Sequence, residues 1–233
     1  MPDLAAALAR HSIELPQDRI ELLERYCRLL WEWNEKINLT RHTDFERFVA
    51  RDVVDSLTVA RQLAEGERVL DVGSGGGVPG IVLAIVRPDL KVTLSESVGK
   101  KSRVLADIVE RMGLPIEVYA GRAEERLASK KFDSLVIRAV APLTKLLLWF
   151  SDMWSQFDRL LAIKGPAWID ERLEAREKNQ LRAFELRKLA TWELPGTESE
   201  SVLLEIKPKR TESTSPAGAK QSAGRPAQKK RDR

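Results

Sequence analysis

A glycine-rich turn directly after an apolar run most constrains the fold of this chain. The stretch VLDVGSGGGVPG, residues 69–80, places five glycines in twelve residues. Glycine lets the backbone adopt left-handed conformations and come close to a ligand, at a cost in backbone entropy. In an open α/β sheet, such a turn lies at the carboxyl end of the first strand, where ligands bind. The stretch therefore predicts a Rossmann-like fold with a ligand site at this turn.

Apolar periodicity around the turn predicts a doubly wound sheet. Helices are predicted over residues 17–38 and 45–63, before any strand, and later over 80–86, 100–112, 124–127, 143–153 and 168–184. Strands are predicted over residues 68–72, 91–95, 116–120, 134–139 and 159–163, and again over 188–193 and 202–206. The alternation favours a mostly parallel α/β sheet with right-handed crossovers. Only a short loop separates the last two strands, so we expect seven strands with an antiparallel C-terminal hairpin.

Three segments with different roles are expected along the chain. Residues 1–64 form an N-terminal helical segment packed on the core, and residues 65–207 form the core itself. Residues 208–233 lack large apolar side chains and are expected to be a disordered basic tail. The stretch 207–233 holds nine Lys or Arg against Glu212 and Asp232, a net of +7, which leaves −3 for the rest against a total of +4. The folded body is therefore not globally basic.

Several classes of protein are disfavoured by composition. Cys27 is the single cysteine, so an internal disulfide is excluded, and with only His11 and His42 as imidazoles no metal site is expected. The sequence has no run of 18 apolar residues and no signal peptide, so we expect no membrane association. A cytoplasmic monomer is the expectation.

The residues around the turn discriminate between cofactors. Gly75, Gly77 and Gly80 satisfy the pattern of dinucleotide-binding folds, which alone is weak, and no Gly-Lys-Ser/Thr follows to make a P-loop. Asp71 places a carboxylate near the strand end, where it would repel a diphosphate and attract the sulfonium and ammonium of S-adenosylmethionine. Glu96, nineteen residues after Gly77, is expected to bond ribose hydroxyls in either cofactor. The pattern favours S-adenosylmethionine, with an NAD-dependent oxidoreductase as an alternative.

The residues after the fourth strand limit the chemistry of the methyl acceptor. Methylation of amino groups in bases commonly uses an Asn/Asp-Pro-Pro-aromatic loop there, whereas this chain has VIRAVAPL. Methylation at pyrimidine carbon 5 needs a cysteine nucleophile, and Cys27 lies in a predicted helix far from the strand ends. A nucleophilic acceptor such as guanine N7 needs no general base, only alignment and exclusion of water. We therefore expect no general base, and no catalytic residue is assigned.

Basic residues point to a nucleic-acid substrate. Lys100, Lys101 and Arg103 open a predicted helix, where the helix dipole favours acidic residues, so their charges suggest phosphate contacts. Solvated surface lysines are the alternative. Arg138 and Lys164, at the ends of the fourth and fifth strands, are expected to face the same cleft, with pairing to a neighbouring acid as their alternative.

Taken together, the motifs of residues 15–207 resemble those of the RsmG family, also called glucose-inhibited division protein B. The motifs, in order, are WNEKINLT, RDVVDS, DVGSGGGVPGI, ESVGKKSRVL, GRAEE, FDSLVIRAVAPL and AIKG. The resemblance implies a class I methyltransferase that methylates N7 of one guanine in 16S ribosomal RNA, near the decoding site. It also implies that the cofactor is bound by Gly73, Val78, Ala123, Glu124 and Arg138, and the RNA by Lys100 and Lys101. One departure is Asp52, which stands where the family usually has histidine.

These observations assign a role to each candidate residue. Asp71, Gly73 and Gly75 are expected to hold the methionine end of S-adenosylmethionine, and Glu96 the ribose. The remaining cofactor residues are Val78, Ala123, Glu124 and Arg138, and the residues expected to hold RNA phosphates are Lys100, Lys101, Arg103 and Lys164. The alternative function with the same RNA partner is that of a non-catalytic RNA-binding factor in assembly of the small ribosomal subunit.

Overall fold

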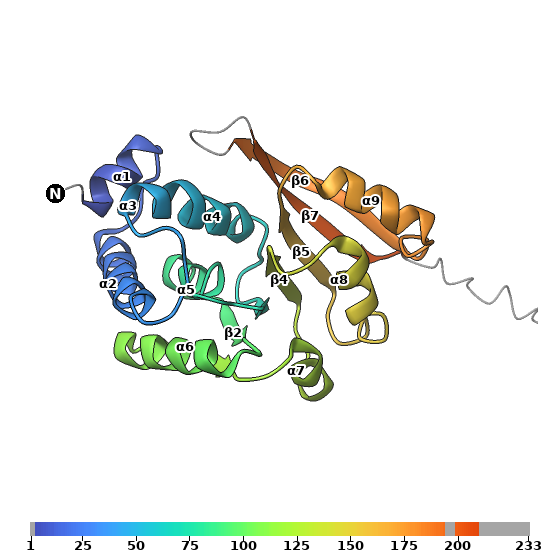
Figure 1. Cartoon of the computed structure of the whole chain (residues 1–233), viewed down its shortest axis with the longest axis horizontal. Helices are drawn as coiled ribbons and strands as arrows, with labels where there is room; N and C mark the ends of the chain where they lie inside the picture. The colour runs from blue at the N-terminus through green and yellow to red at the C-terminus, as the bar shows by residue number, and fades with distance from the viewer. Residues whose placement is uncertain (1–2, 194–198, 210–233) are drawn as a thin grey trace, which may run out of the picture.

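A seven-stranded sheet forms the centre of the computed structural model, which describes residues 3–193 and 199–209 (Figure 1). The strands follow the order β3-β2-β1-β4-β5-β7-β6. They are β1 (Arg68–Val72), β2 (Lys91–Ser95), β3 (Glu117–Tyr119), β4 (Ser134–Arg138), β5 (Arg159–Lys164), β6 (Phe184–Glu193) and β7 (Glu200–Pro208). Strands β1 to β5 are parallel, whereas β7 runs antiparallel to both β5 and β6. The predicted Rossmann-like sheet with a C-terminal hairpin is confirmed.

Helices cover both faces of the sheet (Figure 1). They are α1 (Leu4–Arg10), α2 (Gln17–Asn34), α3 (Phe45–Arg47), the π-helical η1 (Phe48–Val53), α4 (Val54–Ala60), α5 (Gly80–Val86), α6 (Gly99–Met112), α7 (Ala123–Ser129), α8 (Leu143–Trp149) and α9 (Trp168–Glu177). Side chains alternate across β1: Val69 packs with the N-terminal helices, α5 and α6, whereas Leu70 and Val72 pack with α7, α8 and α9. This alternation is the period of a strand that is buried on both faces.

Helix ends differ from the predictions for local reasons. Helix α2 stops at Asn34, whose side-chain oxygen accepts the backbone N–H groups of Leu39 (2.8 Å) and Thr40 (2.9 Å) and turns the chain. Helix α9 stops at Glu177 instead of continuing to 184, because Asn179 adopts a left-handed conformation (φ 58°) that ends a helix. Helix α1 was not predicted from the sequence, although Asp3 caps it by accepting the N–H of Ala6 at 2.6 Å.

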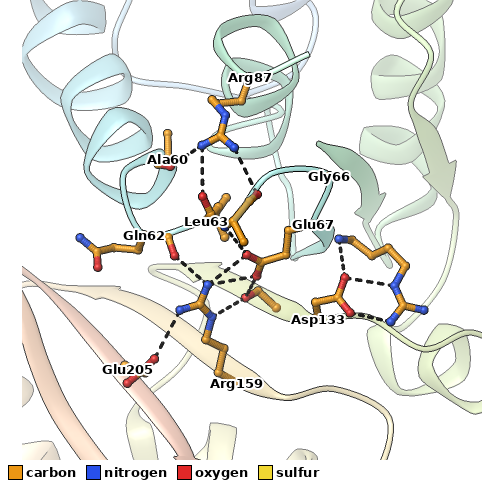
Figure 2. Close-up of polar contacts among 12 residues, drawn as sticks. Ala60, Gln62, Leu63, Gly66, Glu67, Arg87, Asp133, Arg159 and Glu205 are labelled. Atoms are coloured by element: carbon orange, nitrogen blue, oxygen red, sulfur yellow. Dashed lines mark hydrogen bonds and ion pairs between the residues drawn. The ribbon is translucent and has the colours of Figure 1, made fainter. Parts of the chain in front are cut away.

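A polar cluster ties the strands together at their amino ends (Figure 2). Arg159, at the start of β5, lies between Glu67 (3.1 Å) and Glu205 (3.4 Å), and its Nη2 donates to the carbonyl of Gln62 at 2.7 Å. Its Nε donates to the hydroxyl of Ser134 at 2.8 Å. Charge-assisted contacts of this kind hold the loop before β1 against β4, β5 and β7. This cluster occupies the amino ends of the parallel strands, so the candidate ligand site can lie only at their carboxyl ends.

The basic tail predicted over residues 208–233 lies outside the described residues, apart from Pro208, which ends β7, and Lys209. The backbone N–H of Lys209 donates to the carbonyl of Ala183 at 2.9 Å, so the described chain stays attached to the sheet to this point. Within the described ranges, no helix is long and apolar enough to cross a membrane.

Candidate functional site

The glycine turn after β1 forms a cradle at the point where the strand order reverses. Gly73, Gly75 and Gly77 have positive φ angles of 69°, 57° and 104°, which residues with a side chain rarely adopt. The N–H of Gly73 donates to the carbonyl of Ser95 at 2.8 Å, so the turn is fixed to the end of β2. A Cβ atom on Gly73 would lie 2.9 Å from Val140 Cγ2. A side chain at position 73 would therefore collide with Val140, so the turn accepts only glycine there.

A small pocket of about 100 Å³ opens beside this turn. It is lined by Val72, Gly73, Ser95, Ser97, Gly121, Arg122, Ala123, Glu124, Val140 and Trp149. Three of the predicted cofactor residues, Gly73, Ala123 and Glu124, line it together, although β1 and α7 are distant in sequence. The prediction omitted Ser95 and Ser97, which flank Glu96 and could have been found from it. It also omitted Trp149, which is 37% exposed and has no flanking motif.

Asp71 lies beneath the turn rather than in the pocket. Its side chain is only 1% exposed, and its Oδ2 accepts the N–H of Gly80 at 3.0 Å. Burial raises its pKa to about 7, against the hydrogen bond from Gly80, which favours the charged form. Asp71 is not among the residues that line the pocket, and a contact with a ligand at this residue stays a prediction.

Glu96 holds the turn from the end of β2. Its Oε2 accepts the N–H of Gly75 at 2.9 Å, and its Oε1 accepts the N–H of Val98 at 2.8 Å. The carboxylate is buried, and its neighbours Ser95 and Ser97 line the pocket. Each oxygen keeps a lone pair that a ligand hydroxyl could use.

Val78, on the far side of the turn, is placed differently from the other predicted cofactor residues. It is partly buried and packs against the apolar cluster that includes the N-terminal helices. It does not line the pocket beside Gly73.

Arg138 is surrounded by acids from the N-terminal helices. Its Nη2 lies 2.6 Å from Asp52 Oδ1, and its Nη1 lies 3.4 Å from Asp55 Oδ2. Burial lowers the pKa of Arg138, but Asp52 and Asp55 outweigh it, so the net pKa is raised. Burial also raises the pKa of Asp55 to about 6, although Arg138 opposes this. Arg138 Nη1 makes no hydrogen bond within the described ranges, so its contact with Asp55 is that of an ion pair alone.

Asp52, which stands where the RsmG family usually has histidine, contacts a histidine from another segment. His42 Nδ1 lies 2.9 Å from Asp52 Oδ2, and its backbone carbonyl accepts the indole N–H of Trp31 at 2.8 Å. Asp52 therefore contacts both the imidazole of His42 and the guanidinium of Arg138, although residue 52 is not itself histidine.

The predicted RNA-binding residues separate into two groups. Lys100, Lys101 and Arg103 lie at the start of α6, and none makes an ion pair with any residue that the structure describes. Lys164 differs: it is 8% exposed, its Nζ donates to the carbonyl of Ala141 at 2.5 Å, and it lies 2.7 Å from Glu171. This buried ion pair matches the structural alternative for Lys164, and its ammonium has little surface left for phosphate.

A backbone feature follows Arg138 directly. Ala139 has a φ of 53°, in the left-handed region that costs a residue with a Cβ roughly 1–2 kcal/mol. This conformation directs the next residue, Val140, toward Gly73. We expect Ala139→Gly to raise the free energy of unfolding by about 1 kcal/mol, because glycine adopts this conformation freely. Urea denaturation measures the change. Ala139→Val is the opposing control and should destabilise; a destabilised Ala139→Gly would contradict this account.

Comparisons with known proteins agree on one family. The family model described as rRNA small subunit methyltransferase G matches residues 19–202. The protein named ribosomal RNA small subunit methyltransferase G from Rhodopirellula baltica is 49% identical over 192 residues, which cover 82% of this chain and 83% of the relative. A protein of the same name from an Enterobacter species is 34% identical over 206 residues, covering 88% of this chain and 97% of the relative.

Solved structures agree on the fold. A point mutant of MtNAS in complex with S-adenosylmethionine is similar with a TM-score of 0.53 at 16% identity, covering 88% of this chain and 84% of that one. TrmK of M. capricolum, in complex with S-adenosylhomocysteine, has a TM-score of 0.54 at 14% identity, with 67% and 68% covered. At these identities the similarity concerns the architecture alone.

Proposed function

Since the chain belongs to the rRNA small subunit methyltransferase G family, we propose that it transfers a methyl group from S-adenosylmethionine to N7 of a guanine in 16S ribosomal RNA, near the decoding site. The observation that carries this proposal is the 49% identity to a relative of that name over 82% of the chain. The glycine turn at the strand-order reversal, whose positive φ angles and close contact with Val140 disfavour a side chain, fits a cofactor of this class.

We assign the cofactor to the pocket and the adjoining turn. When bound, S-adenosylmethionine supplies a methyl group activated by its sulfonium. Gly73 and Gly75 would bring backbone close to the methionine part, and Glu96 would accept ribose hydroxyls. Ala123 and Trp149, on different elements of the pocket lining, would enclose the adenine. Glu124 lines the same pocket. Arg138 Nη1, which is ion-paired with Asp55 but makes no hydrogen bond within the described ranges, would donate to the methionine carboxylate.

The residues of this chain need not move a proton for such a reaction. Guanine N7 carries a lone pair and attacks without deprotonation, so the protein has to orient the base and exclude water. The buried group of Arg138, Asp52 and Asp55 suits positioning, because its charges are fixed by ion pairs. A catalytic base is not part of the proposal.

The cations at the start of α6 are proposed to hold RNA. Lys100, Lys101 and Arg103 follow the end of β2 and therefore lie at the same edge of the sheet as the cofactor pocket. N7 of a paired guanine lies in the deep and narrow major groove of A-form RNA, which side chains cannot enter. An unpaired loop or an incompletely assembled subunit is therefore the substrate that we favour.

A map of N7-methylguanine in ribosomal RNA tests this function. Cells lacking the protein should lose one such mark in 16S RNA, and the purified protein with S-adenosylmethionine should restore it to RNA from those cells. An unchanged map would contradict the proposal and leave the non-catalytic assembly role.

Asp71 gives the cofactor affinity an expected pH dependence. Its pKa is about 7 in the cofactor-free protein because it is buried. A nearby ligand with positive sulfonium and ammonium groups favours the charged carboxylate, so binding should release a proton below pH 7. Affinity should therefore rise from about pH 6 and level off above pH 7. Calorimetry in two buffers of different ionisation enthalpy measures the proton release.

Asp71→Asn is the control for this dependence, since its side-chain oxygen can still accept from Gly80. The variant should bind more weakly above pH 7 and lose the proton release. If Asp71→Asn released the same number of protons on cofactor binding, the released proton would come from another group.

A further inference from the structure

A groove separate from the cofactor pocket runs between the end of α2 and the start of α6. It encloses about 510 Å³ and is lined by Trp33, Ile37, Lys100, Arg103, Val104 and Asp107. The two helices lie side by side at one end of the molecule (Figure 1). Its walls are mostly apolar, yet two exposed cations stand at its rim. Trp33 and Ile37 take no part in the lining of the cofactor pocket.

Trp33 is held in a fixed orientation in this groove. Its indole N–H donates to Asp107 Oδ2 at 2.7 Å, which ties the ring of α2 to α6. Lys36 Nζ lies 4.8 Å from the ring centroid, a cation–π distance. The side chain is only partly buried. A fixed and partly exposed aromatic ring loses little entropy when a flat group stacks on it.

The charges around the groove fit an anionic ligand. Lys100 and Arg103 are exposed and have no acidic partner in the part of the chain that the structure describes. Asp107, the single acid in the lining, is already engaged by Trp33 and lies 3.4 Å from Arg111. Lys100 also lies in the first turn of α6, where the helix dipole favours anions.

The groove adjoins the proposed methyl-transfer site. Helix α2 and the chain after it pack on the glycine turn, since a Cβ on Gly76 would lie 3.2 Å from Leu30 and 3.4 Å from the carbonyl of Leu39. At the other wall, α6 begins at Gly99, three residues after Glu96. A nucleic acid with one base at the cofactor pocket would therefore pass this groove.

We propose that the groove is a subsite for an unpaired nucleotide that flanks the methylated guanine. Its base stacks on Trp33 and against Ile37, and its phosphates meet Lys100 and Arg103. This inference rests on the proposed function for the identity of the ligand as RNA. Aromatic stacking next to cations is the usual device for binding single strands with little sequence preference. The subsite would therefore select unpaired RNA over a continuous helix.

Binding of RNA probes without any methylation step tests the subsite. The probes are a single-stranded oligoribonucleotide containing a central guanine and the same sequence annealed into a duplex, titrated by fluorescence anisotropy. Trp33→Leu should raise the Kd for the single strand about tenfold or more, whereas Trp33→Phe keeps a stacking face and should raise it far less. Binding of the duplex should change little in either variant. Lys100→Ala with Arg103→Ala should flatten the salt dependence by roughly one contact per cation.

Three controls separate this subsite from other effects. S-adenosylmethionine affinity and the melting temperature of Trp33→Leu should stay close to wild type, which excludes misfolding. Lys91→Ala removes an exposed charge at the amino end of β2 and should leave RNA binding unchanged. Ile37→Asp tests the other apolar side chain on the α2 side of the groove and should weaken single-strand binding as Trp33→Leu does.

The outcomes distinguish failure of the subsite from failure of the function. If Trp33→Leu and Ile37→Asp bind the single strand as wild type does, the subsite is wrong, whatever the enzyme methylates. If only the lysine and arginine changes matter, the surface holds phosphates without a stacked base, and the proposal is overturned. Absence of N7-methylguanine would refute the function, while these titrations would still decide the groove.

Discussion

Replacing Arg138 with methionine is expected to lower the free energy of unfolding by about 3 kcal/mol at neutral pH, because it removes the cation that two buried carboxylates share. Asp52 and Asp55 are nearly inaccessible, and Arg138 is their shared cation at 2.6 and 3.4 Å. The loss should depend on pH. The pKa of Asp55 is already raised to about 6, and removing Arg138 raises it further.

The sign of this dependence follows from which state binds the proton. In the variant, folded Asp55 binds a proton more tightly than unfolded Asp55, whose pKa is near 3.8. The variant should therefore regain stability as the pH falls from about 7 to about 4. Urea denaturation at pH 7 and pH 5 measures both the loss and the recovery. A loss equal at both pH values would contradict a role for buried charge.

Arg159→Met is the matched control for Arg138→Met. Arg159 is also 22% exposed and also lies between two buried acids, Glu67 and Glu205, but at the amino ends of the strands (Figure 2). Both substitutions should destabilise the fold. Only Arg138→Met should also weaken S-adenosylmethionine binding, measured by calorimetry at a temperature where both variants are folded. Equal cofactor affinity in the two variants would remove Arg138 from the proposed site.

The fold could be predicted from the sequence because its signals are local. Apolar runs bounded by turns define strands, and the short connection before residue 200 defines the hairpin. The strand order around β7 required the structure, since insertion of β7 between β5 and β6 depends on which edges pair. Element ends were less predictable: Asn34 and Asn179 end helices through their own side-chain or backbone geometry, which apolar periodicity does not record.

For the candidate site, the motifs predicted which backbone positions lie close together, and the role of those residues stays a prediction. Gly73, Ala123 and Glu124 line one pocket as expected. The direction of each side chain could not be predicted from the sequence. Asp71 and Lys164 lie at strand ends as predicted, yet Asp71 is directed under the turn and Lys164 toward Glu171. Both are ionisable groups whose partners lie inside the protein, on elements that apolar periodicity does not bring together.

Substitution of Gly73 by aspartate is expected to remove measurable cofactor binding, with a rise in Kd of at least about 100-fold. The Cβ would lie 2.9 Å from Val140 Cγ2, and residues 73 and 140 both line a pocket of only about 100 Å³, which leaves little room for a carboxylate. The φ of 69° adds backbone strain of roughly 1–2 kcal/mol to the folded state. Calorimetry with S-adenosylmethionine measures the affinity, and circular dichroism measures whether the fold persists.

Two further variants show whether the loss of cofactor binding comes from the bulk of the new side chain, from its negative charge or from backbone strain. Gly73→Asn has the same size as aspartate without its charge and tolerates a left-handed conformation, so it should lose binding to the same extent if bulk is the cause. Gly113→Asp carries the same charge at a φ of 66°, with nothing within 4 Å of its Cβ, at the end of α6. It should lose about 1 kcal/mol of stability and keep full cofactor affinity. Retained affinity in Gly73→Asn would assign the effect to charge, and retained affinity in Gly73→Asp would place the cofactor elsewhere than at this turn.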